Sequence, residues 1–246
     1  MVPLVLFLAS CQKNEKESIK KNDDDIKIVE TELRSEVCFE ELLGNQCTNQ
    51  VPVIEEYELD NIPGYPSECK FKVRVEILNC NIPNTTITRF FTLSFELIEV
   101  NCPQYENEMN EILFNPGINN PSLDDYLTSL YEKLYRRFED VHFEDFKVFF
   151  NCGGSNQWFE ISHIRESCSR FCVYLTGREG YYLATPIPCG TGCCKIETKM
   201  CFNPTTQMVE KTTTTIPITQ AQCDPPSPSV PFGCYTATNC KFICTQ

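Results

Sequence analysis

Four carboxylates and one imidazole lie within eight residues near the middle of the chain: Glu139, Asp140, His142, Glu144 and Asp145. Clustered carboxylate oxygens are ligands for hard cations such as calcium, and two nearby acids can serve a glycosidase. The ordered loop glycine of a calcium site is missing, which favours a solvated acidic helix end. The sequence therefore assigns no catalytic residue and no cofactor, and these five residues are only weak candidates for a metal site.

The chain contains 17 cysteines among 246 residues, which is unusual for a reduced cytosolic protein. Zinc ribbons prefer cysteine pairs separated by two residues, whereas the pairs here, such as Cys168/Cys172, are separated by three. We expect disulfides formed in an oxidising compartment rather than metal binding or thiol-redox catalysis. The disulfide candidates are Cys38, Cys47, Cys69, Cys80, Cys102, Cys152, Cys168, Cys172, Cys189, Cys193, Cys194, Cys201, Cys223, Cys234, Cys240 and Cys244.

Other chemical motifs are weak. The run Gly153-Gly154-Ser155 differs from the Gly-x-Ser-x-Gly elbow of hydrolases, and the adjacent Ser162 and His163 do not define a triad. Exposed aromatic rings can stack on sugars, but half-buried aromatic rings are also ordinary in a β protein. The aromatic candidates for such stacking are Trp158, Tyr181 and Tyr182.

The chain opens with an apolar run, Met1 to Leu8, of signal-peptide length and too short to span a bilayer. It ends in Leu8-Ala9-Ser10-Cys11. This pattern resembles the lipobox of bacterial lipoproteins, which implies cleavage after Ser10 and a diacylglycerol thioether on Cys11. No Lys or Arg precedes the apolar run, so an ordinary signal peptide with a chance cysteine is the alternative.

Residues 11–36 are polar and read as a flexible tether. Gln12 after the cysteine resembles lipoproteins sent to the outer membrane, and the Lys/Glu-rich start loosely resembles surface lipoproteins of Bacteroidota. The alternative is a solvated charged segment that carries no localisation signal. The resemblance implies an exported protein held at the membrane by its lipid, with an outer-membrane protein as a candidate partner.

Two counts bear on export and on partners. Without Cys11, 16 cysteines remain, an even number that can close as disulfides. The net charge is -13, and residues 37–120 carry 13 acids against 4 bases. Such a field repels phosphate backbones and anionic headgroups, so we expect no nucleic-acid partner and no polybasic membrane contact.

The body begins with strand patterns. Residues 71–77 alternate apolar and charged side chains, and residues 87–100 place Phe91, Leu93, Phe95 and Leu97 at alternate positions. Pro121-Ser122 with Asp125 predicts a helix start, because a capping side chain is followed by an acid three residues later. Apolar side chains at helical spacing then form one stripe. They are Leu123, Tyr126, Leu127, Leu130, Tyr131, Leu134, Tyr135 and Phe138.

The last quarter of the chain differs in composition. Residues 181–246 hold eight cysteines and only seven charged residues, and residues 194–201 and 207–216 predict two strands joined by a turn. We therefore expect a signal peptide over residues 1–10, a lipidated tether over 11–36, an α+β body over 37–180 and a cysteine-rich β subdomain over 181–246.

The predicted fold is α+β and β-dominated, with an antiparallel sheet covered by one amphipathic helix, plus the small disulfide-rich β subdomain. The expected function is that of a cell-envelope lipoprotein acting as a non-catalytic binding or structural component of an outer-membrane or surface complex. An anchored glycosidase or peptidase that uses the 139–145 acids is the alternative. A surface adhesin, the third class, predicts large exposed apolar patches.

Overall fold

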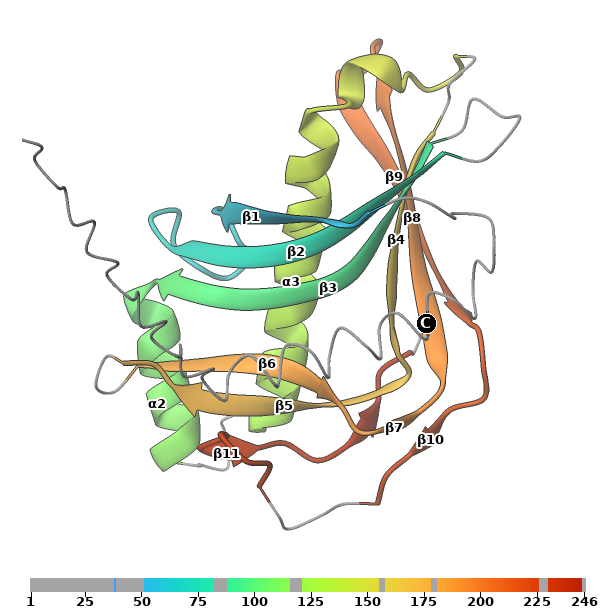
Figure 1. The fold of residues 1–246 in the computed structure, drawn as a ribbon. Helices are drawn as coiled ribbons and strands as arrows, with labels where there is room; N and C mark the ends of the chain where they lie inside the picture. The colour runs from blue at the N-terminus through green and yellow to red at the C-terminus, as the bar shows by residue number, and fades with distance from the viewer. Residues whose placement is uncertain are drawn as a thin grey trace, which may run out of the picture.

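A computed structural model describes Cys38 and residues 51–81, 88–115, 121–154, 158–177, 181–225 and 230–244. Six of the twelve described strands form a sheet with the order β1-β2-β3-β4-β8-β9. Its strands are β1 (Val53–Leu59), β2 (Lys70–Asn81), β3 (Thr88–Asn101), β4 (Phe159–Glu166), β8 (Cys193–Asn203) and β9 (Met208–Pro217). Figure 1 shows β1, β2 and β3 curving away from β4, β8 and β9, so the sheet is strongly bent.

A second sheet is centred on β5 (Cys168–Leu175). Strand β6 (Tyr182–Pro188) pairs with β5 in antiparallel orientation, and the short strands β11 (Thr236–Ala237) and β12 (Lys241–Phe242) pair with β5 as well. A further two-stranded ladder joins β7 (Gly190–Thr191) to β10 (Gln222–Cys223). Strand β6 also contacts β3, which brings the two larger sheets together.

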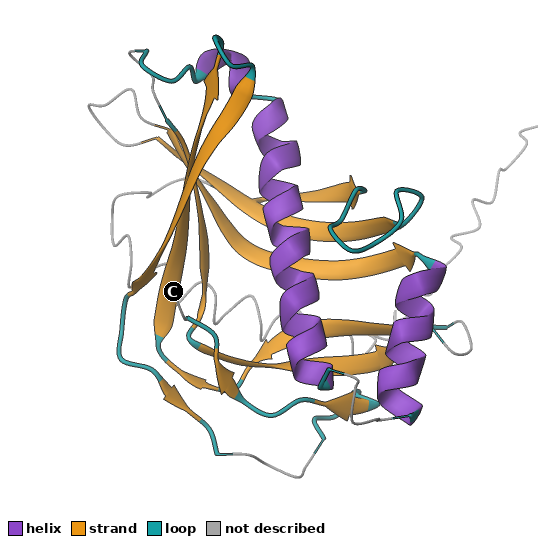
Figure 2. Ribbon diagram, turned by 180° about the vertical axis from the view of Figure 1, so that it is seen from behind, coloured by secondary structure: helices purple, strands orange, loops and turns teal. Residues whose placement is uncertain are grey.

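The described residues include two α-helices, α2 (Pro103–Phe114) and α3 (Leu123–Glu144), and the 3-10 helix η2 (Lys147–Phe149). Helix α3 begins as the sequence predicts, because the Ser122 hydroxyl accepts a hydrogen bond from the Asp125 backbone N–H at 3.2 Å. Figure 2 shows α3 crossing β1, β2 and β3 and continuing to the level of β5 and β6. Its stripe of apolar residues is buried at Leu127, Leu130 and Leu134.

Strand β3 contributes to two apolar clusters. Phe90 and Phe95 belong to the large core with α3, whereas Phe91 and Leu93 belong to a smaller cluster with Cys38 and Ile164. The β2–β3 register shifts between Glu76 and Ile77, where their partners move from Ser94 to Thr92 and Leu93 is left unpaired. One extra residue reverses which face the following side chains occupy. The strict alternation expected from Phe91 to Leu97 is therefore broken in its middle.

Seven disulfides join pairs of described cysteines, which confirms the prediction of a disulfide-rich protein. Four of them fix the C-terminal segment of residues 218–244. They are Cys168–Cys223, Cys172–Cys234, Cys189–Cys240 and Cys194–Cys244. This segment supplies β10, β11 and β12, which are two residues each. Strands this short need cross-links to hold their place.

The β-dominated class predicted from the sequence is confirmed, with two corrections. The main sheet is mixed rather than antiparallel, because β3 and β4 pair in parallel. The described residues include two helices rather than one. The additional helix, α2, has two buried side chains, Tyr105 and Met109. The region 181–246 supplies β8 and β9 to the six-stranded sheet and β6 to the second sheet.

Candidate functional site

A cavity of about 1430 Å³ lies where the two larger sheets and α3 meet. Its lining comes from all six strands of the large sheet, from β5 and β6, from α3 and from the C-terminal segment. Strands β3 and β4 are paired only where Arg89 to Thr92 lie beside Glu160 to His163. Beyond this point β3 continues along β2 and β4 continues along β8, so the two strands diverge. The divergence leaves a wedge-shaped space that side chains of α3 and β6 only partly fill.

One wall of this cavity carries a neutral histidine. His163 lies next to Tyr135 of α3, with 4.6 Å between the ring centroids, and its Nδ1 lies 3.3 Å from the Thr92 carbonyl. Burial lowers the pKa of His163 to about 3, and the nearby Arg165 charge acts in the same direction. The imidazole is therefore neutral at neutral pH, with Nδ1 as the donor to Thr92 and Nε2 as an acceptor.

Arg165 is a cation on the cavity wall that has an unused donor. One guanidinium nitrogen, Nη2, donates to the Ile243 carbonyl at 2.5 Å, whereas Nε is buried and has no hydrogen-bond partner. Within the described ranges no carboxylate lies within 4.0 Å of it. Burial lowers the pKa of Arg165, and the more distant Glu132 and Tyr135 oppose this shift. A half-buried guanidinium with an unused donor can bind a negatively charged or strongly polar oxygen.

Two other cations that line the cavity, Arg74 and Lys241, are paired, whereas Arg136 is exposed and forms no ion pair within the described residues. Arg74 approaches Glu56 at 3.3 Å and Glu96 at 3.7 Å, and Lys241 forms ion pairs with Asp124 and Asp125. Burial raises the pKa of Glu96, and the Arg74 charge opposes this. Thr185 of β6 adds a second buried polar group without a partner, since its Oγ1 has no hydrogen bond.

The five residues of the 139–145 cluster do not converge on one point. Glu139 lines the cavity but pairs with Lys211 of β9 at 2.8 Å, and Asp140 approaches the same ammonium at 3.0 Å. Glu144 forms a surface pair with Lys147, and Asp145 is the C-cap of α3. Burial raises the pKa of Glu139, while Lys211 and Thr198 oppose this shift. The acids therefore serve different contacts around the end of one helix.

His142, the imidazole of that cluster, faces the large core. Its Nδ1 lies 2.9 Å from the Tyr57 hydroxyl, and its ring stacks on Phe138 with 5.6 Å between centroids. Burial lowers its pKa, and the negative charges of Glu55 and Asp145 oppose this. His142 and His163 thus lie in separate environments and form no pair of ligands.

The cysteine pairs separated by three residues bond to distant partners instead of to each other. Residues four apart in a strand are about 13 Å apart, too far for a disulfide. In β5, Cys168 bonds to Cys223 and Cys172 to Cys234. Within the described ranges, the potential metal ligands that converge are Cys152, Cys201 and Glu210, but those two sulfurs form a disulfide with an S–S length of 2.08 Å. This group is therefore not available as a thiolate site.

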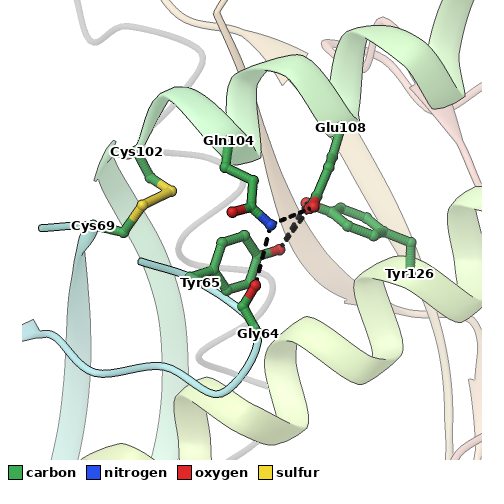
Figure 3. Close-up of a disulfide and its surroundings, with 7 residues drawn as sticks. All are labelled: Gly64, Tyr65, Cys69, Cys102, Gln104, Glu108 and Tyr126. Atoms are coloured by element: carbon green, nitrogen blue, oxygen red, sulfur yellow. Dashed lines mark hydrogen bonds between the residues drawn. A yellow bond between two sulfur atoms is a disulfide. The ribbon is translucent and has the colours of Figure 1, made fainter. Parts of the chain in front are cut away.

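A second cavity, of about 280 Å³, lies between α2 and α3. Several polar groups beside it hydrogen-bond one another. Glu108 accepts hydrogen bonds from Tyr65 at 3.1 Å, Tyr126 at 3.0 Å and Gln104 at 2.8 Å. Gln104 also donates to the Gly64 carbonyl, and the Cys69–Cys102 disulfide lies beside this network, as Figure 3 shows. The arrangement fixes α2 against the loop before β2.

The aromatic residues considered for sugar stacking are not a platform. Tyr181 and Tyr182 are buried, and Trp158 is half-buried. Tyr182 instead packs against Tyr235 of the C-terminal segment, with 5.3 Å between ring centroids. Ser155 of the Gly-Gly-Ser run lies outside the described residues.

Comparison of the chain with protein-family models, with curated protein sequences and with solved structures finds no match. Sequence reasoning missed Arg165, Thr185 and His163 as neighbours around one cavity. Their local signals are weak, because an Arg and a His at alternate positions in a strand are ordinary for a sheet with a solvated face.

Proposed function

We propose that this chain is an exported, lipid-anchored binding protein of the bacterial envelope, without catalytic activity, and that the 1430 Å³ cavity is its binding site. The observation that carries the binding role is the cavity itself, which is lined by Arg165, a residue whose Nε has no hydrogen-bond partner. Small-molecule sites are typically concave, largely apolar and equipped with a few polar groups that orient the ligand. This cavity has each of those features.

The cysteine pattern supports the lipid anchor at Cys11. Each of the 15 described cysteines is disulfide-bonded, and seven bonds account for all of them except Cys80. The chain has 17 cysteines, so Cys11 and Cys47 remain as candidates to bond Cys80. Pairing of Cys80 with Cys47 leaves Cys11 as the single thiol, as the lipobox resemblance requires. Neither described α-helix is long and apolar enough to cross a bilayer.

Anchored hydrolysis is the second candidate, and one observation favours it. Glu96 and Glu139 line the same cavity, and burial raises the pKa of both carboxyl groups, as a general acid requires. Against this, Glu139 is paired with Lys211 and Glu96 lies near Arg74. Turnover of chromogenic glycosides or peptides that is lost in both Glu96→Gln and Glu139→Gln would replace the binding proposal with this one.

The binding role is tested by filling the cavity. Thr128 of α3 lines it, whereas its neighbour Ser129 is exposed and does not. We expect saturable fluorescence enhancement of the neutral apolar probe N-phenyl-1-naphthylamine with the wild type and with Ser129→Trp. In Thr128→Trp the indole occupies the cavity, so probe affinity falls at least tenfold. Equal binding by all three proteins, or no binding by the wild type, contradicts the proposal.

The anchor is tested by metabolic labelling with an alkyne analogue of palmitate. We expect the full-length protein to take up the label and to partition into detergent, and Cys11→Ala to do neither. Cys47→Ala is the matched control, because it removes a cysteine outside the lipobox and is expected to keep the label. Labelling that survives Cys11→Ala contradicts the anchor.

A further inference from the structure

We propose that the ligand of the large cavity is an amphiphile with a single carboxylate, and that Arg165 binds this carboxylate while the apolar chain fills the remaining space. The inference rests on the proposed binding function and adds the chemical class of the ligand to it.

The charge of Arg165 has no close counter-charge among the described residues. Its side chain is half-buried, its Nε has no partner, and its one hydrogen bond is to the neutral carbonyl of Ile243. Removing a guanidinium from bulk water without a counter-charge costs free energy, which an anion in the cavity returns. The Glu132 carboxylate of α3 stabilises the charged form of Arg165 from more than 4.0 Å away, and it accepts no hydrogen bond from the Arg165 Nε.

Arg165 is also in the right place to meet a ligand. Arg165 lines the cavity together with Thr185, whose Oγ1 is buried and also has no hydrogen-bond partner. By contrast, Arg170 of β5 has an unpartnered Nε but does not line the cavity. A guanidinium and a hydroxyl with unused donors, on two residues that line the same cavity, are complementary to the oxygens of one anionic group.

The charges of the lining residues limit the charge of the ligand. The charged residues that line the cavity are six acids and four bases, so the acids outnumber the bases: Glu76, Glu96, Asp125, Glu132, Glu139, Glu166, Arg74, Arg136, Arg165 and Lys241. Their net field opposes an anion, and it opposes a dianionic phosphate more strongly than a monoanionic carboxylate. His163 supplies no counter-charge, because it stays neutral beside Thr92. A lining in which acids outnumber bases, with an unused donor on Arg165, therefore favours a ligand with one negative charge.

The volume and the apolar wall of the cavity indicate the apolar part of the ligand. The cavity is larger than the roughly 300 to 1,000 Å³ of ordinary small-molecule sites. Its apolar wall includes Leu93, Phe95, Phe171, Ile196 and Ile243. Apolar contacts of this kind contribute about 0.8 kcal/mol per buried methylene group. A chain of many methylene groups uses such a wall better than a compact polar molecule does.

The test uses 11-(dansylamino)undecanoic acid and its methyl ester, which differ in the carboxylate charge. With the wild type we expect the acid to bind at least tenfold more tightly than the ester. Arg165→Gln should remove this preference while leaving ester binding unchanged, and Arg165→Lys should retain part of it. Arg170→Gln is the matched control and should keep the full preference. Circular dichroism and thermal unfolding establish that each variant is folded.

Each outcome separates the two proposals. Equal affinity of the wild type for acid and ester, or a preference that survives Arg165→Gln, overturns the carboxylate assignment but leaves the cavity as a binding site. Tighter binding of dodecyl phosphate than of dodecanoate also overturns it. Failure of the wild type to bind either dansyl probe or N-phenyl-1-naphthylamine overturns both proposals. If Arg165→Gln does not fold, the wild-type comparison and Arg165→Lys still decide.

Discussion

At the scale of single residues, burial sets the protonation states around the cavity. His163 is neutral because its ring is enclosed by Tyr135 and lies near the Arg165 charge. Glu139 is buried as well, but it keeps a partner in Lys211. Titratable groups of similar burial thus differ in whether the fold supplies a counter-charge. Because Arg165 has no close counter-charge in the described part of the chain, an anionic ligand can supply one.

The neutral state of His163 has a consequence for stability. The unfolded chain takes up a proton near pH 6.5, whereas the folded protein takes it up near its lowered pKa of about 3. Stability from this group is therefore present above pH 6.5 and is lost as the pH falls toward 3. We expect His163→Gln to reduce the slope of unfolding free energy against pH in this window, measured by urea denaturation. An unchanged slope contradicts the assignment, and His142→Gln serves as the comparison.

At the scale of elements, α3 connects the two larger sheets and forms one wall of the cavity. Its apolar residues face β1 at one end and β5 at the other. The helix starts at a defined residue because Ser122 accepts a hydrogen bond from Asp125 N–H and donates one to the Asp125 carboxylate at 2.6 Å. The position of Thr128 and Tyr131 along the cavity therefore depends on this start.

The cap of α3 can be tested directly. Ser122→Ala removes the side-chain acceptor for Asp125 N–H and should lower the unfolding free energy by about 1 kcal/mol. Ser129→Ala on the exposed face of the same helix should change it by less than about 0.5 kcal/mol. Urea denaturation of both variants measures the difference. Equal effects of the two substitutions would show that the cap contributes nothing.

At the scale of the whole molecule, the C-terminal segment closes the cavity and depends on disulfides for its position. Lys241, Phe242 and Ile243 line the cavity, and the Ile243 carbonyl holds Arg165. Strand β12 forms only a two-residue ladder with β5. The Cys194–Cys244 and Cys189–Cys240 bonds on either side of this ladder therefore hold the wall in place.

Removing one of these bonds should weaken ligand binding as well as stability. We expect the double variant Cys194→Ser/Cys244→Ser to lose about 2 to 4 kcal/mol of unfolding free energy and to bind N-phenyl-1-naphthylamine several-fold more weakly. The variant Cys69→Ser/Cys102→Ser loses a bond beside α2, away from the cavity. It should lose stability and keep its probe affinity. Equal probe affinities in the two double variants would show that the C-terminal segment does not shape the site.

Local patterns in the sequence determined the strands β2, β8 and β9, the start of α3 and the reliance on disulfides. These features depend on neighbouring residues, through period-two alternation, a capping side chain and a high cysteine count. Helix α2 was missed because only Tyr105 and Met109 are buried along it, too few to create a visible stripe. The bulge at Leu93 was missed because it depends on the partner strand.

The cavity and its unpartnered Arg165 were decided by the tertiary structure alone. They exist because β3 and β4 pair in parallel over four residues and then diverge, and because residues 241–243 return from the end of the chain to close the space. Both features join segments that are distant in sequence. No local pattern records such contacts, since strand pairing and disulfide partners depend on the free energy of the whole fold rather than on the spacing of nearby residues.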